Sequence, residues 1–256
     1  MSKQKTKQKI KPMIGLEIHG YLKTKEKLFC NCKAIRHGKK QEIKPNSHIC
    51  PVCTGQPGAK PQLPNKEAIK KVVQIGLMLG CEINTIEDNK KLVWNRKHYS
   101  WPDLPKGYQN TISGAYSIPV VEEGEFENIG IKEAHLEEDP AQWDPQTGRI
   151  DYNRSGLPLI EIVTKPDFKD SKEVESWLKE LILTLSYIKA IDKNAGIKAD
   201  VNVSIDGGER VEIKNVSSIN DIKNAIEYEI KRQSKEKVNM ETRRYDSSKG
   251  KTILMR

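Results

Sequence analysis

The stretch "DVNVSIDGGERVEIKNV", residues 200–216, gives the clearest indication of the fold. Apolar and polar residues alternate on both sides of an Asp-Gly-Gly segment, which is the pattern of a β-hairpin. A two-residue turn would set Asn202 opposite Val211 and mix the two faces. A three-residue loop over residues 206–208 instead pairs Val203 with Val211, and glycine supplies the left-handed conformation that such loops need. This register predicts a polar strip on one face of the hairpin, formed by Asp200, Asn202, Glu212 and Lys214.

Further strands are predicted by the same two-residue period. In "MIGLEIHGYL", residues 13–22, Glu17 and His19 share one face and the large apolar residues around them share the other. Strand-like runs also occur at residues 129–138 and 157–164.

Three segments show the 3.6-residue period of amphipathic helices instead. They begin at Asn65, at the "DSKE" sequence of Asp170 and at Ser218, with the first two residues as expected caps. The buried face of the first helix is expected to hold Ile69, Val72, Val73, Gly76 and Leu77. Strands come in groups, with long helices between some of them. The pattern therefore predicts an α+β fold with a largely antiparallel sheet and flanking helices.

The charge balance is basic, with 44 lysines and arginines against 35 acids among 256 residues, for a net charge of +9. Such an excess suits a polyanionic partner such as RNA, although many basic enzymes bind none. The first twelve residues carry five lysines and no apolar core, so we expect a disordered basic tail rather than a secretory signal or an RNA-gripping arm. No run of eighteen apolar residues occurs, which predicts no membrane span and a cytoplasmic protein.

Four of the five cysteines stand at the spacing of metal ligands. Cys30 and Cys32 form one pair and Cys50 and Cys53 the other, with seventeen residues between the pairs. Two close pairs of thiols suit tetrahedral zinc in a closed, structural site without catalytic water. The alternative is four ordinary buried or free cysteines. Two histidines, His37 and His48, could replace a poor ligand, but we expect them to be surface residues.

Carboxylates and histidines gather on the polar faces of the predicted strands. In "AHLEED" the alternation puts His135, Glu137 and Asp139 on one face and Glu138 on the other. Glu161 interrupts an apolar run, where a buried carboxylate needs a partner. Each of these acids alone could form an ordinary surface salt bridge. Together with Glu17, His19 and the hairpin acids, they predict an oxygen-rich site for Mg²⁺ and nucleotide phosphates, outside the common phosphate-binding loops.

Several longer motifs occur together in a fixed order. They are "GLEIHGYLKTKEKLFCNC", "CPVCTGQPGAKP", "YSWPDLPKGYQ", "HLEEDP", "DYNRSGLPLIEIVTKPD", "DVNVSI" and "VEIKNVSSI". In order and spacing the chain resembles the B subunits of the aspartyl/glutamyl-tRNA amidotransferases over about residues 13–256. The related E subunits fit less well, because "CPVCTGQPG" is similar to the B type and the inserted domain of the E type is missing.

The resemblance implies a cradle-like domain with kinase activity. Members of that family bind a misacylated tRNA, Asp-tRNA(Asn) or Glu-tRNA(Gln), and phosphorylate the side-chain carboxylate with Mg-ATP. Ammonia that a separate amidase releases from glutamine then arrives through an internal channel and displaces the phosphate. The expected partners are therefore the amidase A subunit, a small C subunit, with which the chain would form a heterotrimer, and the tRNA.

The resemblance also assigns roles to individual residues. The metal and phosphoryl-transfer residues, which would hold Mg²⁺, are Glu17, His19, Glu137 and Glu212. The same cavity is expected to hold His135, Glu138, Asp139, Asp200, Asn202 and Lys214. Asn153 and Arg154 are expected to meet the nucleotide or the aminoacyl end, and Glu161 to line the ammonia route. The four cysteines match a zinc-bearing lobe at about residues 28–60, which would brace one wall of the cavity.

The resemblance also sets expectations for domain organisation. Residues 1–12 would be the basic tail and residues 13–256 the cradle domain with its zinc lobe. B subunits normally continue into helical and tail domains that grip tRNA, so we expect these on another polypeptide or in a longer form of the chain. The rival interpretation is a zinc-containing RNA-binding or scaffold module without catalysis. A scaffold would have no reason to keep every acid of the polar strip, and all are present.

Overall fold

The computed structural model describes residues 11–35, 43–84, 92–112, 117–192, 196–205 and 208–255. The chain forms two units: one comprises residues 1–17, 165–180 and 198–256, and the other residues 18–164 and 181–197. The predicted α+β class is confirmed, because a largely antiparallel sheet dominates and helices are few. Most of the predicted basic tail and His37 lie outside the described residues.

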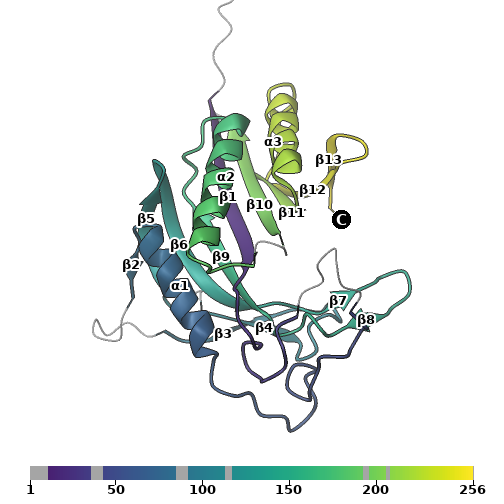
Figure 1. Cartoon of the computed structure of the whole chain (residues 1–256). Coiled ribbons are helices and arrows are strands. Elements are labelled where there is room, and N and C mark those ends of the chain that lie inside the picture. The colour runs from purple at the N-terminus through teal and green to yellow at the C-terminus, as the bar shows by residue number, and fades with distance from the viewer. Residues whose placement is uncertain are drawn as a thin grey trace, which may run out of the picture. The chain divides into compact units, whose positions relative to one another are not determined.

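The first unit is built around the predicted hairpin. Its strands follow the order β13-β12-β11-β10-β1. Their bounds are β1 Pro12–Tyr21, β10 Ile197–Ile205, β11 Val211–Val216, β12 Glu241–Asp246 and β13 Lys251–Leu254. The pairs β10–β11 and β12–β13 are antiparallel, whereas β11 and β12 run parallel. The parallel pair is possible because α3, Ile219–Gln233, connects the two strands and packs against β11 and β13 (Figure 1).

The register of the hairpin is the one that the three-residue loop predicts. Val203 pairs with Val211, and Asn202 with Glu212. A bulge follows, in which two residues of β11, Lys214 and Asn215, stand opposite Asp200 of β10. Asn215 has a φ of 56°, in the left-handed region, so the regular strand conformation is interrupted at this bulge. The loop residues 206 and 207 lie outside the described part of the chain.

Side-chain caps begin the helices of the first unit where the sequence predicts them. The carboxylate of Asp170 accepts from the backbone N–H groups of Lys172 and Glu173 at the start of α2, Ser171–Tyr187. Ser218 caps α3 in the same way. Phe168 stacks edge-to-face on Trp177 of α2, with ring centroids 5.3 Å apart. These contacts fix the start of α2 inside this unit.

The second unit contains a long antiparallel strand pairing, that of residues 131–138 with residues 158–164. Its strands follow the order β1-β9-β6-β4-β3, and β5 pairs with both β6 and β2. Their bounds are β2 Glu82–Ile83, β3 Asn95–His98, β4 Tyr108–Thr111, β5 Val121–Phe126, β6 Ile129–Glu138 and β9 Pro158–Thr164. A separate two-stranded hairpin is formed by β7 Gln142–Trp143 and β8 Ile150–Asp151. The pairs β6–β9, β5–β6 and β4–β6 are antiparallel. Four predicted site residues lie on β6 and β9, namely His135, Glu137, Glu138 and Glu161.

The helix α1, Lys66–Met78, packs against β2, β5 and β6 (Figure 1). Asn65 caps it as predicted, but the predicted buried face is wrong at Leu77, which is 64% exposed. The buried stripe is rotated by about one residue and consists of Ala68, Val72, Ile75, Gly76 and Leu79. The reason lies at Gly76, where an added Cβ would come within 2.4 Å of Val121 in β5. The missing side chain lets helix and strand approach closely, and that contact sets the rotation of the helix.

Candidate functional site

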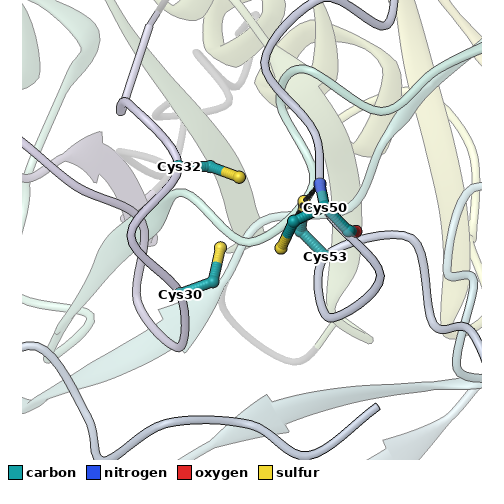
Figure 2. A group of neighbouring side chains, drawn as sticks. All are labelled: Cys30, Cys32, Cys50 and Cys53. Atoms are coloured by element: carbon teal, nitrogen blue, oxygen red, sulfur yellow. Dashed lines mark hydrogen bonds between the residues drawn. The ribbon is translucent and has the colours of Figure 1, made fainter. Parts of the chain in front are cut away.

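The four predicted zinc ligands form one cluster. Figure 2 shows Cys30 and Cys32 on one loop with their sulfur atoms directed toward Cys50 and Cys53 on a second loop. All four sulfur atoms lie within 4.8 Å of one another, and those of Cys50 and Cys53 are 3.9 Å apart. Tetrahedral zinc with Zn–S bonds of about 2.3 Å needs sulfur atoms about 3.8 Å apart. The cluster therefore fits a four-thiolate metal ion after a small contraction.

The four thiols differ in how readily they ionise. A hydrogen bond from Cys30, together with the ammonium of Lys27, lowers the pKa of Cys53 to about 4 against the effect of burial. Burial and a hydrogen bond with Cys50 raise the pKa of Cys32 to about 11. The hydrogen bond to Cys53, together with burial, raises the pKa of Cys30 far above its usual range. A metal ion would need all four groups as thiolates, so its binding would release protons.

The lobe that carries the cysteine cluster, at about residues 28–60, is bonded to the turn after β8. This turn contains Asn153 and Arg154, two of the predicted cofactor residues. Asn153 is 1% exposed; its Nδ2 donates to Lys44 O at 2.8 Å and its Oδ1 accepts from His48 N at 2.8 Å. The Nε of Arg154 donates to Pro140 O at 3.0 Å and lies 3.1 Å from Asp139 Oδ2. Both side chains thus bind parts of the protein itself. Their contact with a nucleotide or aminoacyl end stays a prediction.

In the second unit, ligand atoms of His19, Glu137 and Glu161 lie within 4.8 Å of one another, and we call this set the histidine–carboxylate group. Its elements are β1, β6 and β9, where His135 and Glu161 are direct cross-strand partners. Although burial opposes it, the neighbouring imidazoles of His135 and His19 hold the pKa of Glu161 well below its usual range. Glu161, predicted to line the ammonia route, is therefore also a candidate ligand.

His135 adds a second indication that this group binds something. It is 3% exposed, and its Nε2 lies 3.2 Å from Glu161 Oε2 and 3.7 Å from Glu137 Oε1. Neither ring nitrogen makes a well-aligned hydrogen bond within the part of the chain that the structure describes. Buried polar atoms normally have such a partner, so a cation or a substrate group fits here.

Two lysines that the sequence did not single out pair with the acids of β6. Lys97 Nζ lies 2.8 Å from Glu137 Oε1, and Glu137 raises the pKa of Lys97 against the larger effect of burial. Lys106 Nζ lies 2.5 Å from Glu138 Oε2, which also accepts from Asn110. No local signal could have found these lysines, because they lie about thirty to forty positions away from their partners.

Asp139 directly follows β6 and has different partners from Glu137 and Glu138. Its Oδ2 accepts from the hydroxyl of Tyr21 at 2.8 Å and pairs with Arg154. The three consecutive acids of the "HLEEDP" motif are thus each held by a separate cation within this unit.

In the first unit, ligand atoms of Glu17, Asp200 and Glu212 lie within 4.8 Å of one another, and we call this set the hairpin carboxylate group. Lys214 Nζ lies 2.7 Å from Asp200 and 2.6 Å from Glu212. These two contacts raise the pKa of Lys214 against the larger effect of burial. Asn202 donates to Glu17 at 3.2 Å. The polar strip that the hairpin register predicts is therefore present, with Glu17 of β1 added to it.

The four residues predicted to hold Mg²⁺ are divided between these sets. Glu17 and Glu212 belong to the hairpin carboxylate group, and His19 and Glu137 to the histidine–carboxylate group. A single site made of all four stays a prediction.

No helix in the described residues is both long and apolar enough to cross a membrane.

Comparison with known proteins gives a match over nearly the whole chain. Residues 12–256 match the family model of the GatB/GatE catalytic domain. A relative from Methanopyrus kandleri, the aspartyl/glutamyl-tRNA(Asn/Gln) amidotransferase B subunit, is 45% identical over 95% of this chain and 51% of its own length. Proteins of the same name from Methanocaldococcus jannaschii and Methanothermobacter thermautotrophicus are 45% and 46% identical, over 96% and 94% of the chain. The chain spans about half the length of these relatives.

Proposed function

Because the chain belongs to the GatB/GatE catalytic-domain family, we propose that it performs the synthetic half of a tRNA-dependent amidation. The proposed substrate is Asp-tRNA(Asn), Glu-tRNA(Gln) or both, and the products are the Asn or Gln esters. The observation that carries the proposal is the family match over residues 12–256. The histidine–carboxylate group and the hairpin carboxylate group both lie within the matched residues.

The proposed reaction has two steps, because a carboxylate is a poor electrophile. A side-chain carboxylate oxygen of the aminoacyl ester attacks the γ-phosphorus of ATP, and the bond from that phosphorus to ADP breaks. Ammonia then attacks the acyl carbon, the bond to the phosphate oxygen breaks, and phosphate leaves as nitrogen loses a proton. The side chain ends as an amide, and one ATP becomes ADP and phosphate.

The chain's own residues would organise charge for these steps. Mg²⁺, when bound, would neutralise the charge of phosphate oxygens. The histidine–carboxylate group and the hairpin carboxylate group both have ligand atoms suited to it. Lys97 and Lys214 hold the carboxylates Glu137 and Asp200 in place by ion pairs. We propose that their ammonium groups would interact with phosphoryl oxygens bound beside these carboxylates.

We propose that the cysteine cluster binds zinc as a structural site and that the protein acts in the cytoplasm. The proposed partners are an amidase A subunit, which releases ammonia from glutamine, and a small C subunit, which completes a heterotrimer. The parts of the longer relatives that this chain does not span would complete tRNA binding, in one polypeptide or as a separate one.

The proposal is tested by reconstituting the chain with its A and C partners and a C-terminal helical/tail polypeptide. ADP formation and new Asn or Gln esters are followed with misacylated tRNA, correctly acylated tRNA and no tRNA. We expect ADP and amide only with the misacylated tRNA. Binding of tRNA without ADP in the complete assembly would contradict the proposal and favour the non-catalytic scaffold.

A further inference from the structure

Lys27 is a lysine whose side chain is almost completely buried. It is 1% exposed, and its Nζ lies 3.4 Å from Cys53 Sγ and 3.1 Å from the backbone oxygen of Tyr152. Among the described residues no carboxylate forms an ion pair with it. A buried ammonium needs a compensating negative charge, and sulfur is the anionic partner within reach.

The cysteine cluster provides that charge when a metal ion is bound. A zinc ion with four thiolates keeps two net negative charges, and buried sites of this kind depend on the groups that surround the ligands. We infer that Lys27 is a positioning residue of the cysteine site, which neutralises part of its charge and joins it to the turn of residues 152–156. This inference rests on the zinc site proposed above.

The contacts of the turn of residues 152–156 support the inferred link between this turn and the cysteine site. Ser155 Oγ donates to Cys53 O at 2.7 Å, and Leu28 N donates to Gly156 O at 2.8 Å. At Gly156, with a φ of 82°, an added Cβ would lie 3.6 Å from Cys53 Cβ and 3.7 Å from Lys27 Cδ. The turn therefore lies directly against both the ligand and the lysine.

The same turn is bonded to the end of β6. Gly156 N donates to Asp139 O at 3.0 Å, Asp139 N donates to Leu157 O at 2.9 Å, and Arg154 pairs with the Asp139 carboxylate. A path of direct contacts thus leads from Cys53 through Lys27 and the turn to the acids of β6. Loss of the metal is expected to loosen this turn, because the turn is bonded to Cys53 and the metal would fix the position of that ligand.

The experiment uses the purified chain with zinc bound and compares Lys27→Met, which removes the charge, with Lys27→Arg, which keeps it. Lys25→Met is the matched control, because Lys25 is exposed two positions away. Zinc release to a chromogenic chelator and the thiolate-to-cobalt absorption of the Co²⁺-loaded chain are measured. Hydrogen exchange of residues 151–157 is followed with and without metal.

For Lys27→Met we expect zinc release about tenfold to a hundredfold faster, since groups outside the ligand shell have effects of that size. The turn should exchange faster even while metal is bound. Lys27→Arg should largely restore retention, and Lys25→Met should match the wild type. Wild-type release and exchange in Lys27→Met would overturn the role of Lys27.

Two further outcomes separate this role from the zinc site itself. A wild-type chain that binds neither Zn²⁺ nor Co²⁺ would overturn the zinc site, and the inference with it. If Lys27→Met does not fold, the wild type decides: metal removal must speed exchange in residues 151–157 more than in α3. Equal exchange with and without metal would overturn the link to the turn.

Discussion

The histidine–carboxylate group and the hairpin carboxylate group offer the same number of metal-ligand atoms. They differ in composition and in the strands that supply their residues. The hairpin carboxylate group has three carboxylates, two of them from neighbouring strands of one hairpin. The histidine–carboxylate group takes one residue from each of three strands and includes an imidazole. Oxygen ligands alone favour Mg²⁺, whereas an imidazole extends the range to softer metals. The difference predicts that the two sets prefer different cations.

The largest effect is expected from removing a charge of the histidine–carboxylate group. Glu137→Gln should lower ATP-driven amidation about 10²–10³-fold, as is typical when an electrostatic group at the reacting centre is lost. Folding should be retained, because the amide keeps the shape of the side chain. Steady-state rates of ADP and amide formation measure the effect. Glu180→Gln, at an exposed position of α2, is the control, and wild-type turnover in Glu137→Gln would refute the role of this group.

Cys50→Ser tests the cysteine cluster, which is a metal site of a different kind. We expect zinc affinity to fall at least about a hundredfold, and the free energy of unfolding to fall by about 2.7 kcal/mol when zinc is in excess. Metal analysis and urea unfolding measure the two quantities. Cys81→Ala, which changes a buried cysteine outside the cluster, should keep its zinc. Unchanged zinc content and stability in Cys50→Ser would show that the cluster is not a structural metal site.

Cation binding by the histidine–carboxylate group and by the hairpin carboxylate group can be compared through their lysines, Lys97 and Lys214. Each ammonium competes with a bound cation, so Lys214→Met should tighten Mn²⁺ binding about threefold to fivefold, as expected for a partly exposed ion pair. Lys97→Met should have a smaller effect, because Lys97 contacts one carboxylate and Lys214 contacts two. Titration calorimetry with Mn²⁺ measures both, with Lys179→Met as the control. Weaker binding in both variants would show that the lysines support the cation rather than compete with it.

The smallest effect concerns stability in acid. The pKa of Glu161 is depressed in the folded chain, so the carboxylate contributes stability above its unfolded pKa of about 4.5. That contribution is lost as the pH falls from there toward the folded pKa. Urea unfolding between pH 6 and pH 3 should therefore show a shallower loss of stability for Glu161→Gln than for the wild type. Equal slopes would mean that His19 and His135 do not stabilise the charged form.

The sequence predicts the hairpin carboxylate group better than the other, for a physical reason. Within one hairpin, loop length and alternation determine which residues are opposite each other, and so the pairing of Asn202 with Glu212 could be derived. The cysteine cluster was predictable because its pairs are close in the chain. The position of Glu161 beside His135 depends on the pairing of β6 with β9, which local patterns do not determine.

Lysines were the main omission among the candidate residues. Lys27 stands among charged neighbours that look solvated, yet the fold buries it against Cys53. Lys97 and Lys106 meet acids of β6 only because β3, β4 and their connection reach that strand. The buried face of α1 differs from the predicted one for the same reason, because it depends on a long-range contact between Gly76 and Val121. Residues whose roles come from long-range contacts need the structure to reveal them.

Transfer of oxygen tests the proposed chemistry most directly. Asp-tRNA(Asn) or Glu-tRNA(Gln) with ¹⁸O in the side-chain carboxylate is given to the complete assembly with ATP and glutamine, and the released phosphate is analysed by mass spectrometry. We predict one ¹⁸O atom in each phosphate released with amide, because the carboxylate oxygen that attacks ATP leaves with the phosphoryl group. Phosphate free of ¹⁸O, formed alongside the amide, would contradict activation of the carboxylate by phosphorylation.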